Sequence, residues 1–221
     1  MSLEGLMDMR LVENQDYSWE AVKEKILSLK GRLGMKKSVK LLHVSVDDNG
    51  DMIFHDPRNG VLHNVDNSQV CHQIRRVLFY YSMGDDNFIV DPEQVSYTKI
   101  SLLDDSMHLG CSTNQHRIEA SFQAFFDTDP KAIKDVLETQ FDTKRIDRGD
   151  IGFVVWLLPR VPALIVYNEG EDDEKGEDDG LGCLPSSLNI FFAKSAYKYL
   201  PPNVCETLED IFLWEVSLFL S

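Results

Sequence analysis

The sequence predicts a single α+β domain, with a mainly antiparallel sheet and helices packed on it. Three observations predict this class: an Asn-Gly turn between two apolar runs near the N-terminus, a pair of apolar β-runs joined by a proline-framed turn, and helical spacing of apolar residues between and after them. The 221 residues are 43% hydrophobic and 27% charged, which is ordinary globular composition and enough to bury a core.

The N-terminal part is predicted to hold a helix and a β-hairpin. The helix is expected over residues 18–33, where Ser18 can act as the cap and apolar residues recur at helical spacing. Residues 39–46 and 52–55 read as two strands around the Asn49-Gly50 turn. Residues 1–15 are expected to be disordered or derived from a tag, so that the domain spans residues 16–221.

The middle of the chain is predicted to be mainly helical. A helix is expected from residue 67 or 68 to 82, and others over residues 114–126 and 130–141, the last capped by Asp129 with Pro130 at its first position. Residues 88–103 read as extended or irregular, with a short strand around Val95, Tyr97 and Ile100.

The C-terminal part is predicted to form the central strands and a closing helix. Residues 151–158 and 163–167 are apolar β-runs, and the Pro159 to Pro162 turn between them is expected to lie outside both strand ladders. Residues 188–192 read as a third strand of the same sheet, and residues 207–220 as a helix packed on it.

The charge of the chain excludes several classes of partner. The formal net charge is −15, and no basic stripe appears, so we expect no nucleic-acid partner. Eight of the eleven residues from 169 to 179 are acidic, and we expect this acidic loop, residues 169–180, to be solvated. No apolar run is long enough to span a bilayer and no signal segment is seen, so we expect no membrane partner and a cytoplasmic location.

The ligand-type residues give one weak metal candidate. The cysteines at 71, 111, 183 and 205 form no C-x-x-C pair, and a free buried thiol is the expectation for each. His108, Cys111 and His116 lie within nine positions, and His63, Cys71 or His72 could join them in the fold. Because this spacing matches no zinc template, we expect no metal and no other cofactor.

Catalytic and phosphate-binding motifs are also weak. No G-x-S-x-G turn is present, and Ser195, Lys194, Tyr197 and Tyr199 are expected to serve packing. The segment from Lys30 to Gly34 lacks the strand–loop–helix frame of a phosphate loop, so the sequence gives no support for nucleotide binding. The basic residues Arg75 and Arg76 read as the solvated face of a helix.

Two C-terminal segments carry a resemblance to a known family. They read Leu-Pro-Arg-Val-Pro-Ala-Leu-Ile-Val-Tyr-Asn-Glu-Gly-Glu-Asp from residue 158, and Leu-Asn-Ile-Phe-Phe-Ala-Lys-Ser-Ala-Tyr-Lys-Tyr-Leu-Pro from residue 188. In this the chain resembles the uncharacterised prokaryotic family of domain of unknown function 3786, over about residues 35–220. Two stretches depart from the family pattern, the second acidic cluster at 177–179 and residues 107–112. The resemblance implies a fold and no catalytic residue, and some relatives are joined to iron–sulfur domains of anaerobic metabolism.

We therefore expect a non-catalytic binding or accessory module of such metabolism, iron–sulfur- or corrinoid-linked. The alternative is a small-molecule enzyme with a pocket where residues 108–116 meet residues 195–201. A third alternative is a protein partner, or a homodimer formed through an exposed edge strand or through the final helix. That helix carries more apolar residues than one buried face needs, namely Ile211, Leu213, Trp214, Leu218, Phe219 and Leu220.

Overall fold

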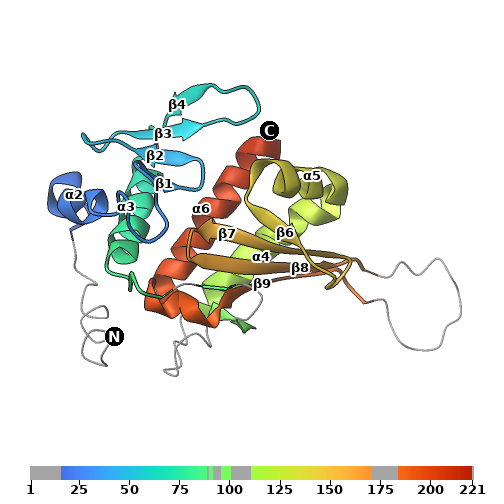
Figure 1. The fold of residues 1–221 in the computed structure, drawn as a ribbon. Helices are drawn as coiled ribbons and strands as arrows, with labels where there is room; N and C mark the ends of the chain where they lie inside the picture. The colour runs from blue at the N-terminus through green and yellow to red at the C-terminus, as the bar shows by residue number, and fades with distance from the viewer. Residues whose placement is uncertain (1–15, 89, 92–95, 101–110, 171–183, 221) are drawn as a thin grey trace, which may run out of the picture.

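The predicted α+β class is confirmed by the computed structural model, which describes residues 16–88, 90–91, 96–100, 111–170 and 184–220 (Figure 1). Its elements along the chain are α2 (Trp19–Leu27), β1 (Val39–Leu41), β2 (Val44–Val46), β3 (Met52–His55), β4 (Leu62–Asn64), α3 (Ser68–Ser82), β5 (Tyr97–Thr98), α4 (Cys111–Thr128), α5 (Pro130–Gln140), β6 (Thr143–Arg145), β7 (Ile151–Leu158), β8 (Val161–Asn168), β9 (Ser187–Ala193), the 3-10 helix η2 (Lys194–Lys198) and α6 (Pro202–Leu220).

The N-terminal hairpin belongs to a four-stranded antiparallel sheet of its own, in the order β1-β2-β3-β4. Gly50 has φ of 90° at the Asn-Gly turn, as predicted for a turn that needs a left-handed residue. The expectation of one strand over 39–46 is wrong, because the chain turns back at Leu42 and His43, and Leu41 pairs with Val44. Leu42 has φ of 50°, a conformation that leucine rarely adopts. No pattern in the sequence predicts it.

The second sheet has the order β5-β9-β8-β7-β6, with every neighbouring pair antiparallel. The predicted apolar strands β7 and β8 are confirmed as buried inner strands. The exclusion of Pro162 from the ladder is wrong, because Pro162 pairs with Trp156. Pairing of β8 with β9 begins only at Ala163, so Pro162 lies at a strand end where its missing N–H leaves no gap in the ladder.

Helix α6 runs through the middle of the molecule and packs against α3, α4 and α5 (Figure 1). Its central place explains the apolar excess of the final helix: Leu213, Trp214, Leu218 and Leu220 are partly buried and pack against the core. The helix begins five positions before the predicted start at 207, with Pro202 in its first turn, where the missing N–H has no cost. Among the described residues, no helix is long and apolar enough to cross a bilayer.

Two other helix boundaries differ from expectation, and two caps agree. Helix α2 ends at Leu27 and not at 33, since Gly31, Leu33 and Gly34 all have positive φ, and α4 begins at 111 and not at 114. The Asn67 side chain accepts hydrogen bonds at the start of α3, and that of Asp129 at the start of α5. The expectations for residues 1–15 and for most of the acidic loop fall outside the described residues.

Candidate ligand-binding groove

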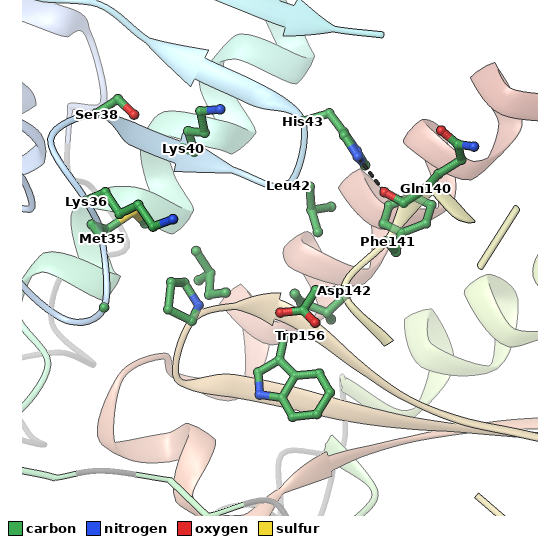
Figure 2. Close-up of a pocket in the computed structure, with 14 residues that line it drawn as sticks. Met35, Lys36, Ser38, Lys40, Leu42, His43, Gln140, Phe141, Asp142 and Trp156 are labelled. Carbon is green, nitrogen blue, oxygen red and sulfur yellow. Dashed lines mark hydrogen bonds between the residues drawn. The ribbon is translucent and has the colours of Figure 1, made fainter. Parts of the chain in front are cut away.

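A groove of about 640 Å³ lies between the two sheets, and we call it the inter-sheet groove (Figure 2). One side comes from the segment before β1 and from the β1–β2 turn; the other comes from the end of α5 and from the β7–β8 end of the second sheet. Its lining residues are Gly34, Met35, Lys36, Ser38, Lys40, Leu42, His43, Gln140, Phe141, Asp142, Trp156, Leu157, Leu158 and Pro159. The volume falls within the range of small-molecule sites.

The first side is shaped by the loop after α2. The Gly31 N–H donates to Lys36 O at 2.8 Å, and the Met35 N–H donates to Arg32 O at 2.7 Å, so the loop closes on itself. The Tyr81 hydroxyl donates to Leu33 O at 2.7 Å and ties the loop to α3. Gly34 then meets the other side of the groove directly, because a Cβ on it would stand 2.6 Å from Pro159 Cβ. Only glycine permits this approach of the two sides.

His43 fastens the β1–β2 turn to the core. Its Nδ1 lies 2.7 Å from Glu215 Oε2, its backbone N–H donates to the same carboxylate, and its Nε2 lies 2.7 Å from Gln140 O. The ring stands edge-on to Phe141 and Phe219 at 5.0 and 5.2 Å between centroids. Three parts of the chain that are distant in sequence, the turn, α5 and α6, therefore meet at one imidazole.

The hydrogen bonds of His43 also limit where protons can lie on its ring and on the carboxyl group of Glu215. Gln140 O can only accept, so Nε2 carries a hydrogen, and Nδ1 faces a carboxyl group. The pair therefore holds either an imidazolium and a carboxylate or a neutral ring and a carboxylic acid. Burial raises the pKa of Glu215, and the hydrogen bonds from His43 oppose that rise. With both nitrogens engaged, His43 is a structural clamp and not a free base.

The groove is lined by both charged and apolar side chains. Lys36 and Lys40 come from the first side, while Asp142 and Trp156 come from the second (Figure 2). Trp156 is partly exposed, and Leu42 packs against the core with part of its side chain open. Such a surface, apolar with a few polar groups placed around it, is typical of sites for small organic ligands.

A second cluster of charged groups is buried between α4, α6 and β9. Glu119 Oε1 accepts from the Lys99 ammonium group and from the Ile190 N–H at 2.8 Å. Glu209 is 1% exposed, and neither of its carboxyl oxygens has a hydrogen-bond partner among the described residues. Burial first, and then the negative charges of Glu119 and Glu206, raise the pKa of Glu209 well above its usual range. Burial without a hydrogen-bond partner and the raised pKa both disfavour the charged form of Glu209.

The predicted metal candidates are not brought together in the described part of the chain. His108 lies outside the described residues, and so does the side chain of Cys111 at the start of α4. The His116 side chain is 78% exposed and stands 3.7 Å from Glu119 Oε2. His63 and His72 are exposed and Cys71 is partly buried. Over the residues that the structure describes, no group of three or more His, Cys, Asp or Glu could hold a metal ion.

The segment 195–201 is placed mostly inside the molecule. Ser195 is buried in η2, and its hydroxyl has no hydrogen-bond partner in the part of the chain that the structure describes. Tyr199 and Leu200 are fully buried, and the Tyr199 hydroxyl donates to Phe88 O at 2.6 Å. Tyr197 is partly buried and Lys194 exposed. Of Arg75 and Arg76, the first donates to Tyr17 O and the second to Thr207 Oγ1, so neither is merely solvated.

Sequence reasoning missed the groove and the buried acids. Leu42 and His43 carry no pattern that separates them from a continuous strand, and Trp156 reads as one more apolar strand residue. The acids had a signal: Glu206, Glu209 and Glu215 interrupt a strongly apolar run, and a charge at such a place is either paired or protonated.

Comparison with known proteins identifies one family. A family model described as a domain of unknown function (DUF3786) matches residues 44–213. This range includes the α5 and β7 side of the groove, while residues 34–43 of the other side precede it. No curated protein and no solved structure matches the chain.

Proposed function

This chain belongs to the family described as a domain of unknown function (DUF3786), and we propose that it is a non-catalytic binding module whose ligand lies in the inter-sheet groove. The observation that carries the proposal is the groove itself, about 640 Å³ with an apolar surface at Leu42 and Trp156 and charged groups around it. A site of that size suits an organic molecule and not a lone ion.

The non-catalytic part of the proposal rests on how the reactive groups of the groove are engaged. Both ring nitrogens of His43 lie 2.7 Å from protein oxygen atoms. A general base needs a nitrogen that can reach the substrate, and a nucleophile needs a base beside it. Among the described lining residues, Ser38 carries the one hydroxyl group, and it is an exposed side chain on a loop.

The alternative enzyme site, where residues 108–116 meet residues 195–201, has less support. Its best nucleophile, Ser195, is buried, and Tyr199 donates its hydroxyl to a backbone carbonyl. His116 is highly exposed. The observation in its favour is the unpartnered Ser195 hydroxyl. If Ser195 acted on a substrate, Ser195→Ala would abolish turnover while leaving ligand binding in the groove unchanged.

An accessory role in anaerobic metabolism follows from the family resemblance alone. As a binding module, the chain would present its ligand to a partner protein that carries the iron–sulfur cluster or corrinoid. The chain alone would then stay colourless after reconstitution with iron and sulfide, and a cluster spectrum would appear only with that partner. A cluster formed on this chain by itself would contradict the accessory role.

Native mass spectrometry of the full chain tests the proposed function. Protein purified from its own host is compared with two variants, Ser38→Tyr, which fills the groove, and Ser121→Tyr, the same change at an exposed serine of α4. We expect an added small-molecule mass on the wild type and on Ser121→Tyr, and its loss from Ser38→Tyr. An added mass that survives in Ser38→Tyr would place the ligand elsewhere and contradict the proposal.

A further inference from the structure

We infer that the ligand of the inter-sheet groove is a phosphate ester, with its phosphate held by Lys36, Lys37 and Lys40 and its apolar or aromatic part beside Leu42 and Trp156. The inference rests on the proposed function and names the chemistry of the same site.

The lysines of this loop are a local excess of positive charge in an acidic protein. The chain has a formal net charge of −15, and three of its described lysines form ion pairs. Lys23, Lys30 and Lys99 form ion pairs with Glu20, Asp48 and Glu119. By contrast, Lys36, Lys37 and Lys40 are exposed, and none of the three has an ion-pair partner among the described residues.

Two of these lysines, Lys36 and Lys37, line a second hollow that adjoins the groove, while Lys40 lines the groove itself. Lys30, Gly31, Lys36, Lys37 and Ser38 line it, its volume is about 810 Å³, and it shares Lys36 and Ser38 with the groove. The space over Gly31 is open, since a Cβ there would meet no atom within 4 Å. The bond from the Gly31 N–H to Lys36 O draws the two lysine-bearing stretches to the same place. Ammonium groups and a hydroxyl group thus face a space large enough for a phosphate.

This arrangement differs from a phosphate loop, because lysine side chains and not backbone N–H groups would bind the phosphate. The loop follows α2 and does not lead into a helix N-terminus, so the anion would be held by point charges and not by a row of backbone N–H groups. Several ammonium groups favour a group with more than one negative charge, as a phosphate monoester or a diphosphate has at neutral pH. Exposed contacts of this kind weaken as salt is raised.

The groove supplies the rest of the recognition. Trp156 offers a partly exposed indole and Leu42 an apolar side chain, on opposite sides of a space of about 640 Å³. A ring placed there would bury apolar area on both faces. A nucleic-acid polymer does not fit, because the acidic remainder of the molecule repels an extended polyanion.

Calorimetric titration of the full chain at low salt tests the inference with three probes: ADP, pyrophosphate and adenosine. We expect ADP to bind most tightly, pyrophosphate more weakly and adenosine weakest. The double substitution Lys36→Gln/Lys40→Gln should weaken ADP binding roughly tenfold, since each exposed contact contributes modestly. The control Lys131→Gln/Lys134→Gln on α5 removes the same charge away from the loop and should change the affinity less than about twofold.

The outcomes separate this inference from the proposed function. Equal weakening by both double substitutions, or binding of adenosine as tight as that of ADP, would overturn the phosphate inference and leave the groove as a site for another ligand. The absence of binding by all three probes would also overturn it. The proposed function fails separately, if the native ligand mass is retained by Ser38→Tyr.

Discussion

The imidazole of His43 lies 2.7 Å from Glu215 Oε2, although the two residues stand 172 positions apart in the chain. Glu215 is fully buried on α6, and His43 lines the inter-sheet groove. This contact joins the β1–β2 turn to the centre of the fold. The position of one side of the groove therefore depends on a buried polar pair, and its removal should affect both stability and binding.

Leucine at either position should destabilise the fold. His43→Leu removes the imidazole from a buried carboxyl group, which keeps only the backbone N–H of position 43. Glu215→Leu leaves Nδ1 of the imidazole and that backbone N–H without their partner. Each should lower the free energy of unfolding by about 3 kcal/mol, and the double substitution should cost less than the sum. Urea unfolding of the four proteins measures this. The control His55→Leu, which loses only the contact with Ser45, should cost about 1 kcal/mol; strict additivity would show that the pair is not coupled.

Replacement of Glu209 by glutamine should stabilise the protein at neutral and alkaline pH. The folded-state pKa of Glu209 is raised above its ordinary value of 4.5 by burial and by Glu119 and Glu206. Its contribution to stability is therefore complete below that ordinary value and is lost as pH rises through the folded-state pKa. Glutamine carries no ionisable proton, so Glu209→Gln should flatten this alkaline loss and add about 1 kcal/mol or more.

Thermal unfolding from mildly acidic to mildly alkaline pH measures the effect of Glu209→Gln. Asp210→Asn is the control, because Asp210 is the neighbour in sequence but pairs with Arg117 at the surface. It should change stability by about 0.5 kcal/mol. If Glu209→Gln destabilised the protein at every pH, Glu209 would be ionised in the folded state and stabilised by a positively charged partner. That result would contradict this prediction.

Protonation of Asp56 should contribute to the loss of folding stability at acid pH. Arg58 donates to Asp56 through its side chain and its backbone N–H, and these bonds lower the pKa of Asp56 to about 2. The stabilisation is present above the ordinary value of 3.8 and is lost as pH falls towards 2. Asp56→Asn should weaken this dependence. Circular dichroism of an acid titration measures it, and an unchanged acid limb would contradict the assignment.

Alanine at Gly34 should disturb the groove more than alanine at Gly31. Both glycines have positive φ, 83° and 76°, so both substitutions carry the strain of a left-handed residue, about 1 kcal/mol. At Gly34 the added Cβ would also stand 2.6 Å from Pro159 Cβ, whereas at Gly31 it meets nothing within 4 Å. Gly34→Ala should therefore cost about 2 kcal/mol more than Gly31→Ala in urea unfolding. Equal costs would show that the two sides separate freely.

Local signals in the sequence predict most of the fold. The Asn49-Gly50 turn, the Asp129 cap and the apolar runs of β7 and β8 each act within a few residues, and each forms as its pattern requires. The predictions that are wrong concern segments whose conformation depends on contacts with residues distant in sequence. Leu42 adopts a left-handed conformation and α6 begins at Pro202 because of neighbours that no local pattern names.

The groove could not be predicted for the same reason. Its two sides come from residues 34–43 and from residues 140–159, and their contacts include the Gly34–Pro159 approach, the contact of His43 with Gln140 O and its ring contact with Phe141. The sequence shows a lysine-rich loop and a tryptophan in a strand, and neither is distinctive alone. Buried acids within α6 were the one signal of an unusual interior, because acids in an apolar helix need a reason.

The claim that the inter-sheet groove is a ligand site is tested most directly by a crystal structure of the protein purified from its own host without removal of bound molecules. We expect density for an organic molecule between Leu42 and Trp156, with a charged group beside Lys36 and Lys40. A ligand bound elsewhere while this groove is filled by the protein's own side chains would contradict it.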